Sequence, residues 1–412
     1  MPHVHTGAQP AVKVAVLGAG GGIGQTLSLL LKTGLAPASV AQQRRVHIAL
    51  YDVNRDAVAG AATDLSHIDT PVSVSWHAPE PAGGADPLAD PLQACLAGAQ
   101  LVVIPAGVPR KPGMTRDDLF NINAQIVRTL ADGIARHCDL ARVFVLLISN
   151  PVNSLVPVLV ETLTQRCRAD AALAAQIPRR VFGLTQLDAV RASSFLHQAL
   201  DCEPSETAVV PVVGGHSGNT ILPLFSQARL EPARGSGAAA ESRTESAAGA
   251  KTGSKIGAKI SAKLGSSILN DTAGMMPTLD PGVRQRLVHR VQFGGDEVVR
   301  AKNGAGSATL SMAYAGAQVA CKFAEMLLGA RNEVRDTLYA KVSGHAAVDA
   351  ITEHVGYFSV PLTITAAQGA AEADTRLLEQ MDTYEREQLW PACLAELRES
   401  VDRGLEWAHA RG

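Results

Sequence analysis

The sequence of 412 residues has few cysteines, no paired cysteine motif and almost no net charge. Its six cysteines lie far apart and none forms a CxxC pair, which argues against a disulfide framework and against a zinc site. The formal net charge is −2, so no overall field attracts nucleic acid or an anionic membrane. These absences favour a reducing compartment and predict neither a metal nor a nucleic-acid partner. Any anion-binding site has to be local.

Long apolar runs are also missing. The run from Val143 to Ile148 is far shorter than the roughly 20 residues that a helix needs to cross a bilayer, so we expect no membrane span. The opening letters MPHVHTGAQP lack the basic start and apolar stretch of a secretory signal, and the chain does not end in a peroxisomal tripeptide. Cytoplasm is therefore the expected compartment, with a mitochondrion or a peroxisome-like organelle as alternatives.

The first part of the chain alternates short apolar runs with helix-length stretches. Hydrophobic residues make up 46% of the sequence, enough for large packed cores. The segments in order are VKVAVL, IGQTLSLLLK, VHIALYD, QLVVIPAG, a helix candidate from Asp118 to His137, and VFVLLIS. Such alternation predicts βαβ units and a parallel sheet covered on both faces. We expect an α/β fold with a doubly wound, Rossmann-type domain over residues 11–150.

Beyond Asn150 the pattern changes to longer helices mixed with strand-like pieces. The helix candidates run from Arg284 to Lys302, from Ala308 to Leu328 and from Tyr384 to Ala408, and the strand-like pieces are TAVVPVVG and VRDTLYAKV. We expect a mixed α+β catalytic domain over residues 151–412. The Pro/Gly/Ala-rich stretch 79–91 is predicted to be a surface loop.

An insertion rich in Gly, Ala, Ser and Lys interrupts the second domain at residues 231–278. This composition buries too little apolar area to offset chain entropy, so we expect disorder. Within it, lysines recur every four residues beside aliphatic side chains, which would make an amphipathic stripe in a helix, but Gly253 and Gly257 oppose a stable helix. A neutral loop is the favoured interpretation, and a targeting or partner-binding element is the alternative.

A glycine-rich loop, Gly18-Ala19-Gly20-Gly21-Gly22-Ile23-Gly24, follows the first strand candidate and opens a helix. In this context glycines let the backbone approach a pyrophosphate, and the helix N-terminus supplies free amide donors. The alternative is a tight turn without a ligand. Asp52 ends the next strand candidate, where a carboxylate would accept hydrogen bonds from ribose hydroxyls and repel a phosphate there. NAD is thus favoured over NADP, although Asp52 could also be a cap or turn residue and Arg55 lies nearby.

Charged groups suited to acid–base chemistry and anion binding stand at three further places. The segment GVPRKPGMTR, which contains Arg110 and Arg116, follows a strand candidate and is predicted to be a mobile loop. Asp188 and Arg191 are three apart on one helix face, and His216 stands in the turn GGHSG. An imidazole held by a carboxylate exchanges protons, and guanidinium groups bind carboxylates. Taken singly, these residues could equally be a turn histidine, an ordinary helix pair and solvated cations.

Several longer motifs follow one another along the chain: GAGGGIG, LYDV, TDLSH, AGVPRKPGMTRDDLFNINAQI, ISNPVNS, LTQLDAVR, VVGGHSGNTILPL and GSATLSMA. In this order and spacing they resemble the lactate/malate dehydrogenase family. The resemblance runs from about Val12 to the C-terminal helix, interrupted by the insertion. It implies that Gly18 to Gly24 and Asp52 bind NAD, and that Asn123, Ile148, Asn150 and Met312 border the cofactor.

The resemblance also implies an NAD-dependent enzyme that interconverts (S)-malate and oxaloacetate. His216 would donate and accept the proton and Asp188 would orient it, while Arg116 would polarise the carbonyl. Arg191 would bind the carboxylate next to the reacting carbon, with help from Asn150, and Arg110 would hold the distal carboxylate. No metal is implied, and the expected assembly is a homodimer, or a tetramer.

Arg110 decides the expected substrate class. Related lactate dehydrogenases typically carry a neutral Gln there, and a guanidinium facing a methyl group would be buried without a partner. Oxaloacetate supplies that partner. The alternatives are a dehydrogenase of another 2-hydroxy acid, and a catalytically silent homologue that uses the insertion to bind a partner.

Overall fold

The computed structural model describes residues 11–80, 90–109, 116–232 and 279–411. The chain folds into two compact units. Of the described residues, unit 1 takes those up to Leu187, Gly295–Asp374 and Leu397 onward, and unit 2 takes Asp188–Gly294 and Thr375–Glu396. The helices α8 (Gln186–Leu200), α11 (Gly294–Ala301) and α15 (Trp390–His409) each contain a point where the chain passes from one unit to the other.

Unit 1 is built on a sheet whose first six strands are parallel, in the order β3-β2-β1-β4-β5-β6. This is the strand order of dinucleotide-binding folds. The sheet continues through β11 and β12 to β13, and these strands pair antiparallel. The strands are β1 (Val12–Leu17), β2 (Val46–Tyr51), β3 (Ser73–His77), β4 (Leu101–Ile104), β5 (Phe144–Leu147), β6 (Val181–Gly183), β11 (Glu333–Lys341), β12 (Tyr357–Thr365) and β13 (Gly369–Ala373).

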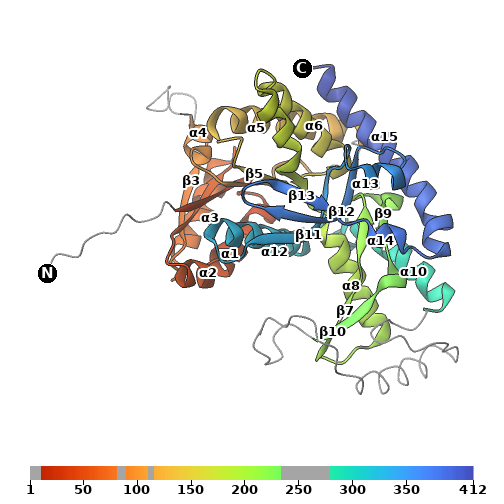
Figure 1. Ribbon diagram of the computed structural model, residues 1–412. Helices are drawn as coiled ribbons and strands as arrows, with labels where there is room; N and C mark the ends of the chain where they lie inside the picture. Colours follow the sequence, from red (N-terminus) through yellow and green to blue (C-terminus); the bar gives the residue numbers. More distant parts are fainter. Residues whose placement is uncertain (1–10, 81–89, 110–115, 233–278, 412) are drawn as a thin grey trace. The chain divides into compact units, whose positions relative to one another are not determined.

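Helices cover both faces of this sheet. Figure 1 shows α5 and α6 on one face and α1 and α12 on the other. Because both faces are covered, β4 and β5 are buried at every position, which explains their continuous apolar sequences. The helices of unit 1 are α1 (Gly22–Gly34), α2 (Ala36–Ala41), α3 (Arg55–Ser66), α4 (Pro91–Leu96), α5 (Arg116–His137), α6 (Val152–Arg166), α7 (Ala171–Gln176), η1 (Ile177–Arg179), α12 (Leu310–Leu328) and α13 (Ala346–Ile351).

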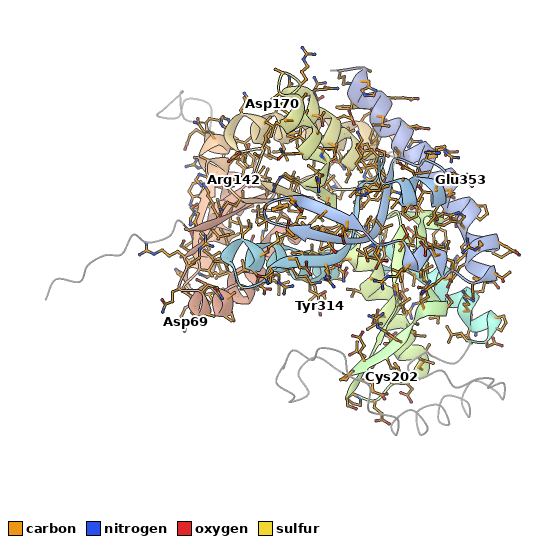
Figure 2. All side chains as sticks on the ribbon, viewed as in Figure 1. Asp69, Arg142, Asp170, Cys202, Tyr314 and Glu353 are labelled. Carbon is orange, nitrogen blue, oxygen red and sulfur yellow. The ribbon has the colours of Figure 1, made fainter. Side chains whose placement is uncertain are left out.

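Side-chain caps fix where several helices begin. Asn54 accepts a hydrogen bond from the amide of Ala57 at 3.1 Å and starts α3. Asp170, labelled in Figure 2, accepts one from Leu173 at 3.0 Å and starts α7. These short polar side chains satisfy amide groups that have no partner inside the helix. By contrast, α1 has Gly21 at its N-cap position and no side-chain cap.

Unit 2 packs α8 and α10 (Pro281–Gln292) on two small antiparallel strand pairs. The pairs are β7 (Glu206–Val209) with β10 (Arg229–Pro232), and β8 (Val212–Gly214) with β9 (Ile221–Pro223). Apolar residues from α8, the strands and α10 form one buried cluster, in which Leu196, Phe225 and Val291 are almost fully buried. The remaining elements are η2 (Gly218–Thr220), η3 (Phe225–Gln227), α14 (Arg376–Glu379) and the π-helical segment η4 (Glu385–Leu389).

Three expected elements differ from their prediction in the structure. The predicted helix from Arg284 to Lys302 is wrong as one helix, because the backbone of Phe293 leaves the helical region between α10 and α11 and two glycines follow. The predicted strand TAVVPVVG is also divided, since Pro211 cannot donate a ladder hydrogen bond, and β7 and β8 have different partners. The predicted helix from Tyr384 begins with the π-helical η4 and becomes α-helical at Trp390.

The two predicted low-complexity stretches lie largely outside the described residues. Of the loop predicted at 79–91, residues 81–89 are not described, and Asp90 caps α4. Of the insertion predicted at 231–278, residues 231–232 belong to β10 and the rest, including the lysine stripe, is not described. The boundary predicted at residue 150 stays a prediction.

Candidate functional site

The glycine-rich loop lies at the carboxyl end of β1, where the chain turns into α1. Gly18 has a φ of +101°, and a methyl group built there would lie 2.5 Å from the α-carbon of Ala106. A methyl group on Gly24 would lie 2.2 Å from the carbonyl oxygen of Gly18. Both positions therefore require glycine, the first for its conformation and both for close packing. The loop amides of Gly18 and Ala19 donate to the carbonyl of Tyr51, which fixes the loop against the end of β2.

Asp52 follows β2 directly and holds the middle of this loop. Its Oδ2 accepts a hydrogen bond from the amide of Gly20 at 2.8 Å, and its Oδ1 accepts one from the amide of Asn54 at 2.9 Å. Arg55, which left the choice of cofactor open, forms an ion pair with Glu80 at 2.8 Å and lies over the ring of Trp76. The structure therefore pairs Arg55 with Glu80 and places the carboxylate of Asp52 at the glycine-rich loop.

Asn123 joins the loops that follow β4 and β5. It is almost fully buried on α5, where its Oδ1 accepts from the amide of Val108 at 2.9 Å and its Nδ2 donates to the carbonyl of Asn150 at 2.7 Å. Ser149 donates to the carbonyls of Ile104 and Ala106. Asn123, Ile148 and Asn150 are thus brought together at the carboxyl ends of β4 and β5. The glycine-rich loop follows the carboxyl end of β1, on the same side of the parallel strands.

Met312 lies near the start of α12 and is 4% exposed. The start of this helix also adjoins the glycine-rich loop, since a methyl group on Gly22 would lie 3.3 Å from the side chain of Thr309. Thr309 therefore contacts the loop, although the sequence alone did not single it out. It belongs to the motif GSATLSMA together with Met312, but the spacing of that motif gives no sign of the contact.

His216 and Asp188 form a buried hydrogen-bonded pair in unit 2. The Nδ1 of His216 lies 2.5 Å from Oδ2 of Asp188, and the two side chains are 8% and 0% exposed. Arg191, one turn later on α8, places Nη1 3.6 Å from Oδ1 of the same aspartate. The structure thus brings His216 to Asp188, which stands 28 positions before it in the sequence, and Asp188 also lies beside Arg191. A methyl group on Gly294 would lie 3.1 Å from Cδ of Arg191, so glycine leaves room for this side chain.

The turn that carries His216 is held by its own hydrogen bonds. Gly214 has a φ of +98°, and a methyl group there would lie 2.2 Å from the carbonyl oxygen of Thr220. The amide of Gly215 donates to that carbonyl at 2.7 Å, and the amide of Ser217 donates to the Thr220 hydroxyl at 3.0 Å. The letters GGHSGNT therefore form a closed turn that presents the imidazole beside α8.

Arg110 lies outside the described residues, and Arg116 is described only as the first backbone position of α5. The structure therefore does not place either guanidinium. In the described part of the chain, no helix is long and apolar enough to cross a membrane. No group of three or more potential metal ligands occurs among the described residues either.

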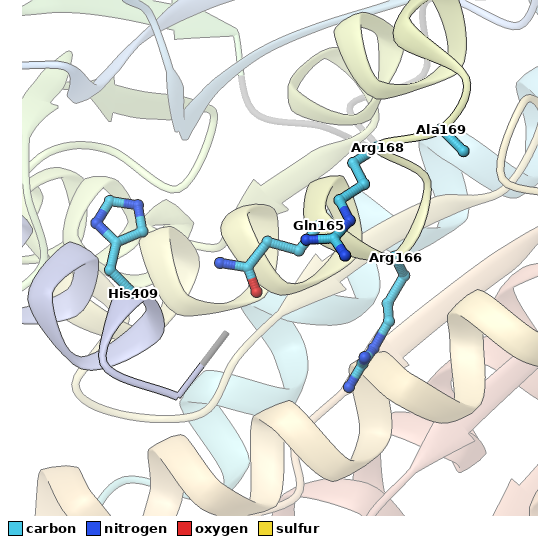
Figure 3. A pocket seen from close by; sticks show the side chains of 5 residues that line it. All are labelled: Gln165, Arg166, Arg168, Ala169 and His409. Carbon is cyan, nitrogen blue, oxygen red and sulfur yellow. The ribbon is translucent and has the colours of Figure 1, made fainter.

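A cavity of about 510 Å³ lies in unit 1 and is lined by residues other than the predicted site residues. Figure 3 shows its lining side chains at the ends of α6 and α15, where they are Gln165, Arg166, Arg168, Ala169 and His409. Arg166 is paired with Asp132 at 2.7 Å, and this pairing raises the pKa of the guanidinium. None of the predicted site residues lines this cavity.

Two family models match most of the chain. The model described as the NAD binding domain of lactate/malate dehydrogenase matches residues 12–174. The model described as the alpha/beta C-terminal domain of lactate/malate dehydrogenase matches residues 185–235 and 249–408.

Curated relatives resemble the chain over nearly its whole length. The cytoplasmic malate dehydrogenase of Saccharomyces cerevisiae is 42% identical, with 100% of this chain and 99% of the relative covered. The mitochondrial malate dehydrogenase of Schizosaccharomyces pombe is 38% identical, with coverages of 96% and 92%. Among solved structures, malate dehydrogenase of Cryptosporidium parvum has a TM-score of 0.62 at 21% identity, with coverages of 97% and 99%, and supports the fold alone.

These matches decide several predictions made from the sequence. The Rossmann-type α/β fold, NAD as cofactor and the class of NAD-dependent malate dehydrogenase are confirmed. The roles assigned to single residues stay predictions. The chain belongs to the lactate/malate dehydrogenase family.

Proposed function

We propose that this chain interconverts (S)-malate and oxaloacetate and that the buried pair of His216 and Asp188 moves the proton. The pair itself is the observation that carries the proposal, because a buried imidazole bound to a buried carboxylate at 2.5 Å is poised for acid–base chemistry. Asp188 accepts from Nδ1, which fixes the tautomer and assigns the proton exchange to Nε2.

The residues around the glycine-rich loop suit NAD. The loop permits close approach of a pyrophosphate, and the uncapped N-terminus of α1 offers amide donors and a partial positive charge. The carboxylate of Asp52 suits ribose hydroxyls and disfavours a phosphate there. When bound, NAD accepts the hydride from the carbon that bears the malate hydroxyl. We assign the border of this site to Gly18 through Gly24, Asp52, Asn123, Ile148, Asn150 and Met312.

In malate oxidation, Nε2 of His216 takes the hydroxyl proton, and Asp188 stabilises the resulting imidazolium. Arg191 binds the carboxylate beside the reacting carbon, and Asn150 contributes an amide. In the reverse direction the imidazolium returns the proton as the carbonyl is reduced, while Arg116 polarises that carbonyl. Arg110 pairs with the distal carboxylate, which excludes substrates that end in a methyl or aromatic group.

The experiment follows NADH absorbance with (S)-malate, (R)-malate and (S)-lactate, each with NAD and with NADP. We expect turnover with (S)-malate and NAD, and a loss of about 10³-fold or more in kcat for His216→Asn, which keeps a polar side chain but removes the base. Equal turnover of (S)-lactate would favour a dehydrogenase of another 2-hydroxy acid. NADH binding without any turnover would favour a catalytically silent homologue.

A homodimer is the assembly that we propose. Its support is an apolar strip on α12, where Leu310 and Tyr314 are 70% and 49% exposed one turn apart. Tyr314, labelled in Figure 2, lies on the side of α12 that faces away from the sheet. Exposed aliphatic and aromatic side chains of this kind favour burial against a second copy. We expect dimer elution from a sizing column and monomer elution for the double variant Leu310→Glu with Tyr314→Glu, whereas monomeric wild type would contradict the proposal.

Cytoplasm is the compartment that we propose. One relative that covers the whole chain is described as cytoplasmic, while others are described as mitochondrial or peroxisomal. A fluorescent fusion at the C-terminus that is diffuse in the cell would support this compartment, and an organellar signal would contradict it.

A further inference from the structure

A carboxylate on the C-terminal helix contacts the turn that carries His216. Oε1 of Glu396 accepts a hydrogen bond from Nδ2 of Asn219 at 2.5 Å. A methyl group built on Gly218 would lie 3.6 Å from Oε2, so the second carboxylate oxygen lies over the same turn. Both partners belong to unit 2, as do His216 and Asp188.

A second contact comes from the same face of α15. Cys393, one helical turn before Glu396, is fully buried, and its thiol donates to the carbonyl oxygen of Thr220 at 3.3 Å. Burial raises the pKa of this thiol, and Glu396 raises it further, so the sulfur stays protonated and donates. The turn from Gly214 to Thr220 is therefore fixed from outside at two points three residues apart on one helix.

The external contacts add to the turn's own hydrogen bonds, and they matter because three of its seven residues are glycines. Gly214, Gly215 and Gly218 are all within it, and glycine loses more conformational freedom on folding than other residues. Asp188 holds the buried imidazole at Nδ1, which orients the ring but does not by itself fix the backbone. The bond from Asn219 to Glu396 is charge-assisted, the stronger class of hydrogen bond.

We propose that Glu396, acting through Asn219, is a positioning residue that holds the His216 turn in the geometry needed for proton transfer. The inference rests on the proposed function of His216 and assigns no contact between Glu396 and substrate. Small displacements of a catalytic group can lower a rate by about 10²-fold, so a loosened turn lowers kcat much more than it changes the KM for NAD.

The test compares Asn219→Ala, Glu396→Leu and Glu396→Gln in malate oxidation. We expect the first two to lower kcat about tenfold with the KM for NAD within about twofold of wild type. Glu396→Gln rescues kcat, because the amide oxygen accepts the same hydrogen bond. The double variant Asn219→Ala with Glu396→Leu is no worse than either single variant, since both remove one interaction. Glu399→Leu, on the same helix but exposed, is the matched control and stays at the wild-type rate.

Thermal unfolding separates positioning from loss of fold. Variants whose Tm stays close to that of wild type while kcat falls support the inference, and Asn219→Ser is a milder substitute if Asn219→Ala does not fold. Wild-type kcat in both Asn219→Ala and Glu396→Leu would overturn the inference, as would equal losses in Glu399→Leu. A wild-type protein that does not oxidise malate at all would instead overturn the proposed function, and the inference with it.

Discussion

At the scale of single residues, Asp188 and His216 form the pair on which the proposed chemistry depends. Asp188 is fully buried and holds Nδ1 of His216, so its carboxylate selects the imidazole tautomer. We expect Asp188→Asn to keep the shape of the pair but to favour the wrong tautomer, and kcat to fall by about 10³-fold to 10⁴-fold. Steady-state kinetics test this, with circular dichroism as the control for folding. A loss below about tenfold would show that the aspartate does not orient the base.

Asp52 gives a prediction about the cofactor. Its carboxylate accepts amide hydrogen bonds from Gly20 and Asn54, so Asp52→Asn keeps one acceptor oxygen while it removes the charge. We expect the ratio of kcat/KM for NADH over NADPH to fall about tenfold or more, because repulsion of the phosphate is lost. An unchanged ratio would show that another group discriminates between the cofactors.

Sequence could identify these residues only through whole motifs. His216 and Asp188 stand 28 positions apart, and the hydrophobic periodicity of the two segments does not indicate that the Gly-rich turn contacts the helix. The contacts of Asn219 with Glu396 and of Thr309 with the glycine-rich loop were not foreseen at all. Such contacts depend on packing between distant segments, which local patterns do not contain.

At the scale of elements, the parallel strands were predictable because strands that are buried on both faces have continuous apolar sequences. The strand predicted as VKVAVL corresponds to β1 from Val12 to Leu17. The divided elements were less predictable. Pro211 separates two strands within an apolar stretch, and Phe293 separates two helices within one helix-length stretch, and both divisions depend on pairing partners and backbone geometry rather than on composition.

The glycine-rich segment from Gly18 to Gly24, which ends in the first turn of α1, gives a stability prediction. A methyl group on Gly24 would collide with the carbonyl oxygen of Gly18 at 2.2 Å, whereas one on Gly21 would lie 3.7 Å from that oxygen, an ordinary contact. We expect Gly24→Ala to lower the free energy of unfolding by about 1–3 kcal/mol or more, since overpacked backbone cannot yield easily. Gly21→Ala is the matched control and should leave Tm near that of wild type. Equal Tm values for both variants would contradict this account of the loop.

Two histidines on the neighbouring strands β2 and β3 predict that the stability of the fold depends on pH. His47 on β2 hydrogen-bonds Ser73 and Ser75 on β3, and Ser75 also bonds His77. Burial lowers the pKa of both histidines below 6.5, and Lys13 lowers it further. The unfolded chain therefore binds more protons, so stability falls as the pH drops through 6.5 toward the folded-state values.

Urea unfolding tests this between about pH 7.5 and about pH 5.5, where the unfolded histidine titrates. We expect His47→Gln to reduce the loss of stability on acidification. His67→Gln, at an exposed histidine just after α3, is the control and should leave the loss unchanged. Identical pH profiles for wild type and His47→Gln would contradict the contribution assigned to His47.

At the scale of the whole molecule, the chain on each side of residues 233–278 is anchored in the core of unit 2. Ala228 and Leu279 both belong to its buried cluster. Glu385 accepts from the amide and hydroxyl of Ser226 and pairs with Arg284 at 2.7 Å, so one carboxylate holds both flanks. These contacts do not involve the segment between them.

We therefore expect the segment to be dispensable for catalysis. Replacing residues 236–276 with a short Gly/Ser linker should leave Tm and the kcat for malate close to those of wild type, because the flanking contacts stay intact. The control is Glu385→Leu in the full chain, which should lower Tm because it leaves the buried guanidinium of Arg284 with fewer partners. Loss of activity on replacement would give the segment a part in the site, and altered location with intact activity would support a targeting element.

The substrate is the central claim, and it is tested most directly by the rate of NADH oxidation with oxaloacetate, pyruvate and phenylpyruvate for wild type and Arg110→Gln. We predict a kcat/KM for oxaloacetate at least about 10³-fold above those for the other two, and a fall of about 10²-fold for oxaloacetate in the variant, because the distal carboxylate loses its charged partner. Comparable rates with pyruvate or phenylpyruvate in the wild type, or no turnover with oxaloacetate while NADH binds, would contradict the account.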